Sequence, residues 1–284
     1  DSASFTFEIS AVDDSPTAIT LSDSSIIENI LGDQVGSITV TDVDSSSFTY
    51  TISGADAALF EITNDGVLKL KDTLTVNFEA DASYSITLTA TDSASNSFSK
   101  DYTISVSDVN ETPSALALSS STFAENAAGA TVGTISATDP DSGETFTYSI
   151  TGTDKDSFEL SGTTLKLKDT ISADFESDSS YSITLTATDS ADNSVSKDYT
   201  ISVSDVNEVA TVVLGNTSVI ENTSGGTVGT ITITDPDIGS NNTLSISGSD
   251  KDSFELSGTT LKLKDSVSAD FETDASYSIT LTAT

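Results

Sequence analysis

Apolar and polar residues alternate along much of this chain. Residues 181–188 ("YSITLTAT") place Tyr, Ile, Leu and Ala on one side of an extended strand, and Ser and Thr on the other. Residues 199–206 ("YTISVSDV") and 164–169 ("TLKLKD") alternate in the same way. A period of two predicts strands that turn one face to a core and the other to water.

The residue types agree with this pattern. Thr, Val, Ile, Tyr and Phe, which favour strands, fill these stretches. Segments such as "TSGGT" and "LSGTT" predict the turns between them. Roughly seven short strands in each stretch of 97 residues are typical of a β-sandwich. No amphipathic stripe three helical turns long occurs, so we predict an all-β fold.

The pattern is repeated along the chain. One segment recurs as "ENILGDQVGSITVTDVD" from Glu28, "ENAAGATVGTISATDPD" from Glu125 and "ENTSGGTVGTITITDPD" from Glu221, at offsets of 97 and 96 residues. The text "NFEADASYSITLTAT" from Asn77 returns, slightly varied, at the same offsets. This period is longer than that of solenoid repeats, and it predicts one domain per repeat.

The repeat sets the expected domain boundaries. We predict complete repeats at 15–111 and 112–208, a repeat lacking its final strand at 209–284, and the last strand of an upstream repeat at 1–14. With neither an initiator Met nor a signal peptide, the chain is expected to be part of a longer protein. An alternative is that the strand at 4–12 completes the open sandwich of a neighbouring molecule.

Charge narrows the classes of function. Asp and Glu number 45 against 10 lysines, which gives a net charge of −35. Such a chain repels phosphates, so we expect no nucleic-acid partner. No apolar stretch approaches the ~18 residues that a membrane span needs, so we expect no membrane insertion in this segment. Because His and Cys are absent, Ser-His-Asp and Cys-His catalysis and the usual zinc and copper sites are excluded. Two explanations of the negative charge remain: an acidic solvated surface, or a protein that binds cations.

The acids of the second repeat stand at the ends of predicted strands. In a sandwich whose strands alternate in direction, these positions gather at two ends of the domain. The expected C-terminal group is Glu125, Asp174, Glu176, Asp205, Asn207 and Glu208, and the expected N-terminal group, facing the preceding repeat, is Asp139, Asp141 and Asp189.

This set resembles the calcium-binding motifs of cadherin repeats. An early Glu, "DFE", "DVNET", "DPD" and "ATD" occur in the family's order across essentially the whole chain. The wording "TVGTISATDPDSGETFTYSI" looks most like the cadherin-like repeats of large bacterial surface proteins and adhesins. The resemblance implies tandem Greek-key, seven-stranded sandwiches in a linear rod, with three Ca²⁺ ions in each linker.

Carried over residue by residue, the resemblance implies ligands at three junctions. Ca²⁺ takes about 6–8 oxygen ligands, which Asp, Glu, Asn and backbone carbonyls supply. Without cations, carboxylates at ~4–5 Å repel by about 3–4 kcal/mol per pair at an effective dielectric constant of about 20. The implied ligands are Asp13, Asp14, Asp42, Asp44 and Asp92 upstream; Glu28, Asn77, Glu79, Asp108, Asn110, Glu111, Asp139, Asp141 and Asp189, with the Thr112 carbonyl, at the first complete junction; and Glu125, Asp174, Glu176, Asp205, Asn207, Glu208, Asp235 and Asp237 at the second.

Departures from the family pattern affect the expected affinities. Asn77 replaces the first acid of "DFE", so the first complete junction loses one charge. Glu111 and Glu208 stand where the family usually has Asp. The "ATD" acid of the second junction would follow Thr284, so we expect one ion there to be weak or missing.

Other interpretations of single motifs are weaker. Asp174 with Glu176 could form a glycosidase acid pair, but catalytic sites rarely recur in every domain of an array. The lysine pairs, such as Lys69 with Lys71, are expected on a solvated face, although a Lys–Asn isopeptide crosslink stays open.

The sequence therefore predicts a non-enzymatic extracellular rod on a bacterial cell surface. Ca²⁺ would stiffen its linkers, and the rod would act in cell adhesion or as a spacer. Its partners would be neighbouring repeats, like molecules or other cell-surface components. Two alternatives stay open: a subunit of an extracellular filament or surface layer assembled by strand donation, and a module that recognises a glycan or a protein.

Overall fold

The computed structural model describes residues 2–237 and 239–284. The chain divides into two compact units. One extends to Ala115 and includes Ala137–Thr147 and Thr188–Val195; the other comprises Leu116–Ser136, Tyr148–Ala187 and Ser196–Thr284. The loops at the N-terminal end of the second repeat thus belong to the same unit as the first repeat. No helix in the described ranges is long and apolar enough to cross a membrane.

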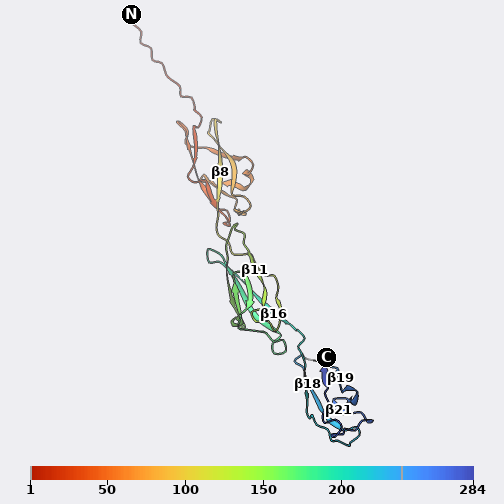
Figure 1. The fold of residues 1–284 in the computed structure, drawn as a ribbon. Helices are drawn as coiled ribbons and strands as arrows, with labels where there is room; N and C mark the ends of the chain where they lie inside the picture. Colours follow the sequence, from red (N-terminus) through yellow and green to blue (C-terminus); the bar gives the residue numbers. More distant parts are fainter. Residues whose placement is uncertain (1, 238) are drawn as a thin grey trace. The chain divides into compact units, whose positions relative to one another are not determined.

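The first repeat is a sandwich of two four-stranded sheets (Figure 1). One sheet has the order β1-β3-β6-β5 and the other β2-β8-β7-β4. Neighbours are antiparallel except β2 and β8, which run parallel. The strands are β1 (Ala18–Leu21), β2 (Ser25–Ile27), β3 (Gln34–Thr41), β4 (Thr49–Ser53), β5 (Phe60–Ile62), β6 (Val67–Leu70), β7 (Ser83–Thr91) and β8 (Ser97–Ser107).

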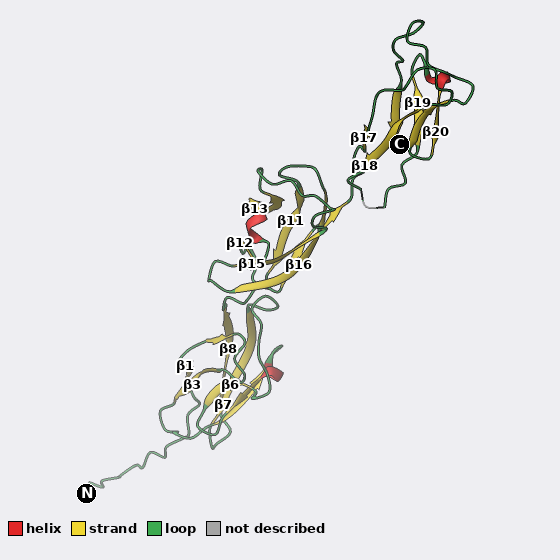
Figure 2. Cartoon of the chain, turned by 90° about the horizontal axis from the view of Figure 1, so that it is seen from below, coloured by secondary structure: helices red, strands yellow, loops and turns green. Residues whose placement is uncertain are grey.

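The second repeat has the same topology, with sheets β13-β14-β11-β9 and β10-β16-β15-β12. A single 3₁₀ turn precedes the fifth strand of each of the first two repeats, drawn in red in Figure 2. The elements are η1 (Ala57–Leu59), β9 (Ala115–Leu118), β10 (Thr122–Ala124), β11 (Thr131–Thr138), β12 (Thr147–Thr151), η2 (Lys155–Ser157), β13 (Phe158–Ser161), β14 (Thr164–Leu167), β15 (Ser180–Thr188) and β16 (Ser194–Ser204).

The all-β prediction is confirmed, with one refinement to the first strand. That strand is divided into β1 and β2, which join opposite sheets. At the division, Asp23 Oδ1 accepts the N–H groups of Ser24 (2.6 Å) and Ser25 (3.1 Å). A side chain that caps its own backbone competes with the strand ladder, and the chain turns there.

The predicted period of two appears directly in the burial of the strands. On β7, Tyr84, Ile86, Leu88 and Ala90 are buried and alternate with more exposed Ser and Thr. An edge-to-face aromatic pair closes each core: Phe60 with Tyr84 at 6.2 Å between ring centroids, Phe158 with Tyr181 at 5.5 Å, and Phe254 with Tyr277 at 5.4 Å. Such aromatic pairs stabilise the fold beyond the contribution of their buried apolar area.

The third repeat keeps one complete sheet, β17-β18-β21-β20, and a two-stranded sheet, β19-β22. In the described ranges, no strand after β22 takes the place that β8 and β16 have in the other repeats. Its elements are β17 (Thr211–Leu214), β18 (Thr227–Thr234), β19 (Leu244–Ser247), η3 (Lys251–Ser253), β20 (Phe254–Ser257), β21 (Thr260–Leu263) and β22 (Thr280–Ala283).

Residues 2–17 form no strand. Phe5, Phe7 and Ile9 are 77%, 88% and 97% exposed. A strand needs a neighbour to satisfy its backbone groups, and no described residue forms a strand ladder with this segment. That it ends an upstream repeat stays a prediction, and Asp1 of that range lies outside the described residues.

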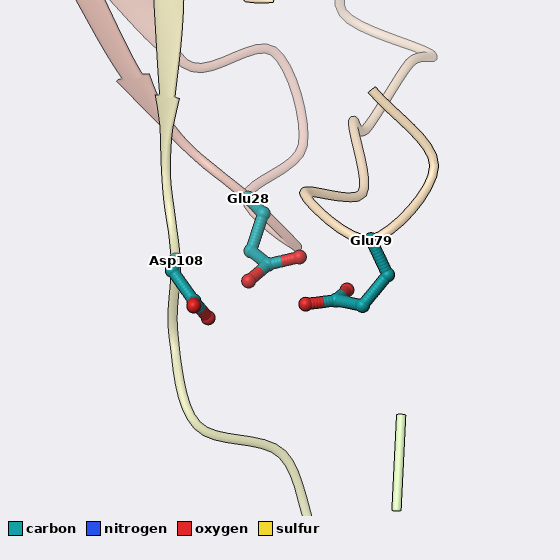
Figure 3. Close-up of side chains that lie close together, drawn as sticks. All are labelled: Glu28, Glu79 and Asp108. Atoms are coloured by element: carbon teal, nitrogen blue, oxygen red, sulfur yellow. The ribbon is translucent and has the colours of Figure 1, made fainter. Parts of the chain in front are cut away.

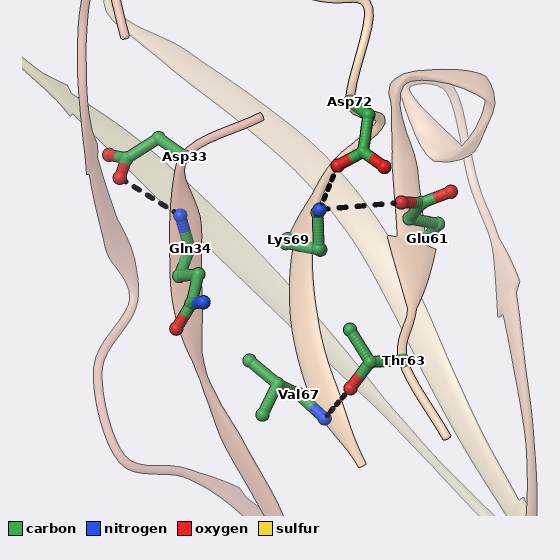
Figure 4. A network of polar contacts seen from close by, with 7 residues as sticks. All are labelled: Asp33, Gln34, Glu61, Thr63, Val67, Lys69 and Asp72. Carbon is green, nitrogen blue, oxygen red and sulfur yellow. Dashed lines mark hydrogen bonds and ion pairs between the residues drawn. The ribbon is translucent and has the colours of Figure 1, made fainter. Parts of the chain in front are cut away.

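The lysine prediction was wrong for one member of each pair. Lys69 is only 14% exposed in its side chain and forms ion pairs with Glu61 (3.6 Å) and Asp72 (Figure 4). Lys166 with Glu159 and Asp169, and Lys262 with Glu255 and Asp265, repeat the arrangement. The hydrogen bond with Asp72 raises the pKa of Lys69, which keeps its amine cationic and a poor nucleophile.

We expect Leu88→Ala to lower the free energy of opening of β7 and β8 by about 2–5 kcal/mol, because it empties a fully buried site. Hydrogen exchange of the amides of these two strands measures this quantity. Leu31, 65% exposed, offers the matched control: Leu31→Ala should change it by less than about 0.5 kcal/mol. Similar effects of both substitutions would contradict the assigned core.

Candidate metal centres

Carboxylates from two successive repeats meet at the first complete junction, all within one compact unit. Glu28, Glu79 and Asp108 form one group, shown in Figure 3. Glu79, Glu111 and Asp141 form a second group. In each group, one oxygen from every residue lies within 4.8 Å of the others. Because Glu79 belongs to both groups, the geometry outlines two adjacent cation positions that share a ligand.

Glu28 is the anchor of this junction. It follows β2 directly and is only 1% exposed. The Phe78 N–H donates to its Oε2 (2.9 Å) and the Val109 N–H to its Oε1 (2.8 Å). These bonds fasten the "NFE" turn and the end of β8 to one carboxylate, which places Glu79 and Asp108 beside it.

A backbone N–H of the linker donates a hydrogen bond to an acid of the next repeat. The Glu111 N–H donates to Asp141 Oδ2 at 2.7 Å. Asn110 Nδ2 donates to Asp189 Oδ2 (2.9 Å) and to the Glu111 carbonyl (2.7 Å). Asn29 Nδ2 also donates to Glu111 Oε1. These hydrogen bonds bring ligand candidates of both repeats together.

Several carboxylate oxygens in these groups are buried without a hydrogen-bond partner. They are Glu111 Oε2 and Asp139 Oδ2 at the first complete junction, Glu176 Oε1 and Glu208 Oε2 at the second, and Asp42 Oδ2 and Asp92 Oδ2 upstream. A buried acceptor with no partner carries a desolvation penalty, and nearly all such groups in folded proteins are satisfied. Bound cations would satisfy these oxygens.

The pKa shifts at the first complete junction also favour bound cations there. Burial raises the pKa of Asp108, and the carboxylates of Asp141 and Glu28 raise it further. Burial and neighbouring acids also raise the pKa of Glu111 and of Asp139. Burial acts in the same direction on Asp189, but hydrogen bonds from Asn110, Asn193 and Ala191 together lower its pKa. Asp108, Glu111 and Asp139 are thus penalised for their negative charge.

The second junction repeats this design within the other unit. Glu125, Glu176 and Asp205 form one group, and Glu176, Glu208 and Asp237 form another. Glu125 is 3% exposed and accepts the N–H groups of Phe175 (2.7 Å) and Val206 (2.8 Å).

The linker of the second junction and the pKa shifts of its acids resemble those of the first complete junction. The Glu208 N–H donates to Asp237 Oδ2 at 2.8 Å. Burial, followed by nearby carboxylates, raises the pKa of Glu176 and Asp205. Asp235 differs, because the Asn242 side chain donates to it (2.6 Å) and lowers its pKa.

Several of the upstream ligands proposed from the sequence lie close together. The Asp14 N–H donates to Asp44 Oδ2 at 3.0 Å, the same bond that Glu111 and Glu208 make. Asn96 Nδ2 donates to Asp13 Oδ2 at 3.0 Å. Asp92 is 6% exposed and points one unpartnered oxygen into the group. Burial, with Asp92 and Asp44, raises the pKa of Asp13.

Several proposed ligands belong to neither group of their junction, among them Asn77 and Asp174. Asn77 Oδ1 accepts the Ala80 N–H (2.8 Å), and Asp174 accepts both the N–H (3.1 Å) and the hydroxyl (2.8 Å) of Ser177. Both side chains cap their own turn. In the structure they shape the loop that presents Glu79 or Glu176.

One acidic group was missed by the sequence analysis. Glu221, Asp270 and Glu272 also bring oxygens within 4.8 Å of one another, although all three are exposed. They are the third copies of the early Glu and of "DFE", so the repeat alone could have identified them. In the described part of the chain, Glu221 accepts one backbone N–H, that of Phe271 (3.2 Å).

The donor set suits a hard cation. All candidate ligand atoms are oxygens of carboxylates, amides or the backbone, and the sequence has no His or Cys. Such oxygens prefer Ca²⁺ or Mg²⁺ to zinc or copper.

Comparison with known proteins agrees with the fold. Residues 119–204 match the cadherin domain family. The chain is 29% identical over 278 residues to the protocadherin-like wing polarity protein stan of Drosophila melanogaster. That match covers 89% of this chain and only 8% of the relative.

Solved cadherin structures share the architecture. Protocadherin Gamma B7 extracellular cadherin domains 1–4 match with a TM-score of 0.63 and 24% identity, over 95% of this chain and 72% of that one. Mouse cadherin-23 EC22–24 matches with a TM-score of 0.65 and 22% identity, over 90% of each chain. This chain is a tandem of cadherin-like β-sandwiches, and its central repeat matches the cadherin domain family.

Proposed function

We propose that this chain is a calcium-binding extracellular segment in which Ca²⁺ stiffens the connections between repeats, and that it serves in adhesion or as a spacer. The observation that supports this most is the junction itself. Acids of two successive repeats converge there, with carboxylate oxygens that are buried and unpartnered.

In this proposal each side chain has a defined task. Glu28 and Glu125 stay fixed by two backbone N–H groups each and present their carboxylates to the first cation position. Glu79 and Glu176 bridge the two positions. Asp141 and Asp237 bring in the following repeat. When bound, Ca²⁺ supplies positive charge that offsets the repulsion among these groups.

The link to stiffness follows from which elements carry the ligands. Glu28, Glu79 and Asp108 belong to the first repeat, whereas Asp139, Asp141 and Asp189 belong to the second. Bending at the linker would separate oxygens that share an ion. With the ion removed, the same oxygens repel one another, so bending becomes favourable.

Calcium fits this site better than magnesium. Ca²⁺ accepts irregular sets of about 6–8 oxygens, whereas Mg²⁺ demands near-octahedral geometry and keeps several waters. The groups here are crowded with carboxylates on several loops, which suits the larger ion. The same acids recur at successive junctions, and we assign them a structural rather than a catalytic role.

The setting of the segment is also part of the proposal. Calcium at millimolar concentration is an extracellular condition, and sites of modest affinity in extracellular modules are tuned to it. We propose an extracellular location, with like molecules or cell-surface components as partners. A location on a bacterial cell surface is also part of this proposal, because residues 131–150 resemble the repeats of bacterial surface proteins. The chain spans about 8% of the length of its curated relative. Any role of a longer parent protein is therefore also part of this proposal.

Calcium should raise the melting temperature of the chain, because a ligand of the folded state adds stability as RT ln(1 + [L]/Kd). The double variant Asp139→Asn, Asp141→Asn should lose part of this rise, while the new amide at position 141 keeps an oxygen for the Glu111 N–H. Differential scanning calorimetry with calcium and with a chelator measures both effects. The control Asp156→Asn alters an acid with an 86% exposed side chain and should keep the full rise. An equal rise in all variants would contradict the assignment.

Chelation should also change the dimensions of the chain in solution. Small-angle scattering in millimolar calcium should give a narrow distribution of end-to-end lengths, and scattering in EDTA a shorter and broader one. The double variant should resemble the chelated chain at its first junction even in calcium. Identical profiles with and without calcium would refute the stiffening.

A further inference from the structure

In the first two repeats, the anchor glutamate is followed by an asparagine in the left-handed backbone region. Asn29 and Asn126 have φ angles of 59° and 61°. Residues other than Gly adopt this region infrequently, and Asn is among the types that tolerate it best. Both asparagines are exposed, so neither belongs to a core. Tolerance of the turn is the simplest explanation of Asn at these positions, and the contacts of the side chain test it.

The backbone at this turn is held by two hydrogen bonds. The Glu28 N–H donates to the carbonyl of the last residue of β8 (3.2 Å), and the Asn29 N–H donates to the Val76 carbonyl (3.1 Å). Glu125 and Asn126 make the same two bonds in the second repeat (3.2 and 3.0 Å). The turn therefore fixes the asparagine between the end of the final strand and the loop that carries the bridging glutamate.

The side-chain amide of each asparagine makes a contact that a glycine could not make. Asn29 Nδ2 donates to Glu111 Oε1, and Asn126 Nδ2 donates to Glu208 Oε1. Gly would adopt the same φ without strain, but it carries no donor. The same bond recurs although the residues after the two asparagines differ, "ILGD" in one repeat and "AAGA" in the other. This recurrence indicates that the amide, and not the turn alone, accounts for Asn.

Each linker glutamate is held at two points. The Glu111 N–H donates to Asp141 Oδ2 of the following repeat (2.7 Å), and its Oε1 accepts from Asn29 of the preceding repeat. Its other oxygen, Oε2, is buried without a hydrogen-bond partner. Glu208 has the same arrangement, with Asp237 at 2.8 Å and an unpartnered Oε2. One carboxylate oxygen is thus fixed by an amide, and the other has no partner within the described ranges.

The length of the linker acid explains the use of an amide. The upstream linker has Asp14 at the corresponding position, and its N–H makes the same backbone bond, to Asp44. Glu111 is one methylene longer, and a longer side chain loses more rotamer freedom when it is fixed. A hydrogen bond to Oε1 restricts these rotamers. Because the amide is neutral, it orients the carboxylate without cancelling the charge that attracts a cation.

We propose that Asn29 and Asn126 are positioning residues of the cation sites, each orienting the linker glutamate so that its second oxygen faces the cation. This inference rests on the proposed function. Hydrogen-bond partners of ligating carboxylates typically contribute about 10–100-fold to metal affinity. The two asparagines are therefore part of the cation site without contacting the ion.

Calcium titrations of the full chain, followed by NMR, test this proposal. The amides of residues 108–111 report on the first complete junction, and those of residues 205–208 on the second. Asn29→Gly keeps the turn and removes the donor, so it should raise the half-saturating calcium concentration of the first junction by about tenfold and leave the second unchanged. Asn126→Gly should do the reverse, so each variant is the matched control of the other.

A further control and a double-mutant cycle separate positioning from a role in the turn alone. Ser95, between β7 and β8, also has a positive φ (73°), and Ser95→Gly should change neither junction. In a chain carrying Glu111→Asp, the shorter side chain is expected not to reach Asn29. In that background Asn29→Gly should change the half-saturating concentration by less than about twofold.

Equal effects of Asn29→Gly with Glu and with Asp at position 111, or no effect in the otherwise unmodified chain, would overturn the positioning role and leave calcium binding standing. A chain in which calcium shifts the amides of neither junction would refute the proposed function, and this inference with it.

Discussion

The crowding of carboxylates at each junction is the constraint on which the rest of this structure depends. Oxygens from Glu28, Glu79 and Asp108 lie within 4.8 Å of one another, and the second group shares Glu79. Like charges at such distances are unfavourable unless a cation lies among them. The fold holds them there by backbone hydrogen bonds to Glu28 and Asp141, so the cost is built into the native state.

The third repeat shows how far this arrangement depends on the final strand. Glu28 and Glu125 are buried because the backbone following β8 or β16 donates to them. Glu221 has the same sequence context, but the described residues supply no second backbone donor to it, and it is exposed together with Asp270 and Glu272. The burial of the anchor Glu therefore goes together with the backbone N–H that follows the final strand.

Much of this was predictable from the sequence, because the signals are repeated. The period of two gave the strands, the offset of 97 residues gave the domains, and strand ends gave the acids that meet at each junction. Local side-chain capping was not predictable from these patterns. Asp23 divides the first strand, and Asn77 and Asp174 cap turns next to the ligand candidates. The ion pairs of Lys69 were also not predicted: Glu61 faces it across β5 and β6, and Asp72 reaches it from the turn three residues later.

Calorimetric titration of the chelator-treated chain with calcium tests the central claim most directly. Two overlapping groups occur at the first complete junction and two at the second junction, so saturable uptake of at least four ions per chain is predicted. Magnesium should compete poorly, because Mg²⁺ demands near-octahedral geometry and keeps several waters, whereas Ca²⁺ accepts irregular sets of oxygens. A chain that takes up no calcium at millimolar concentration, or binds it no better than magnesium, would contradict the account.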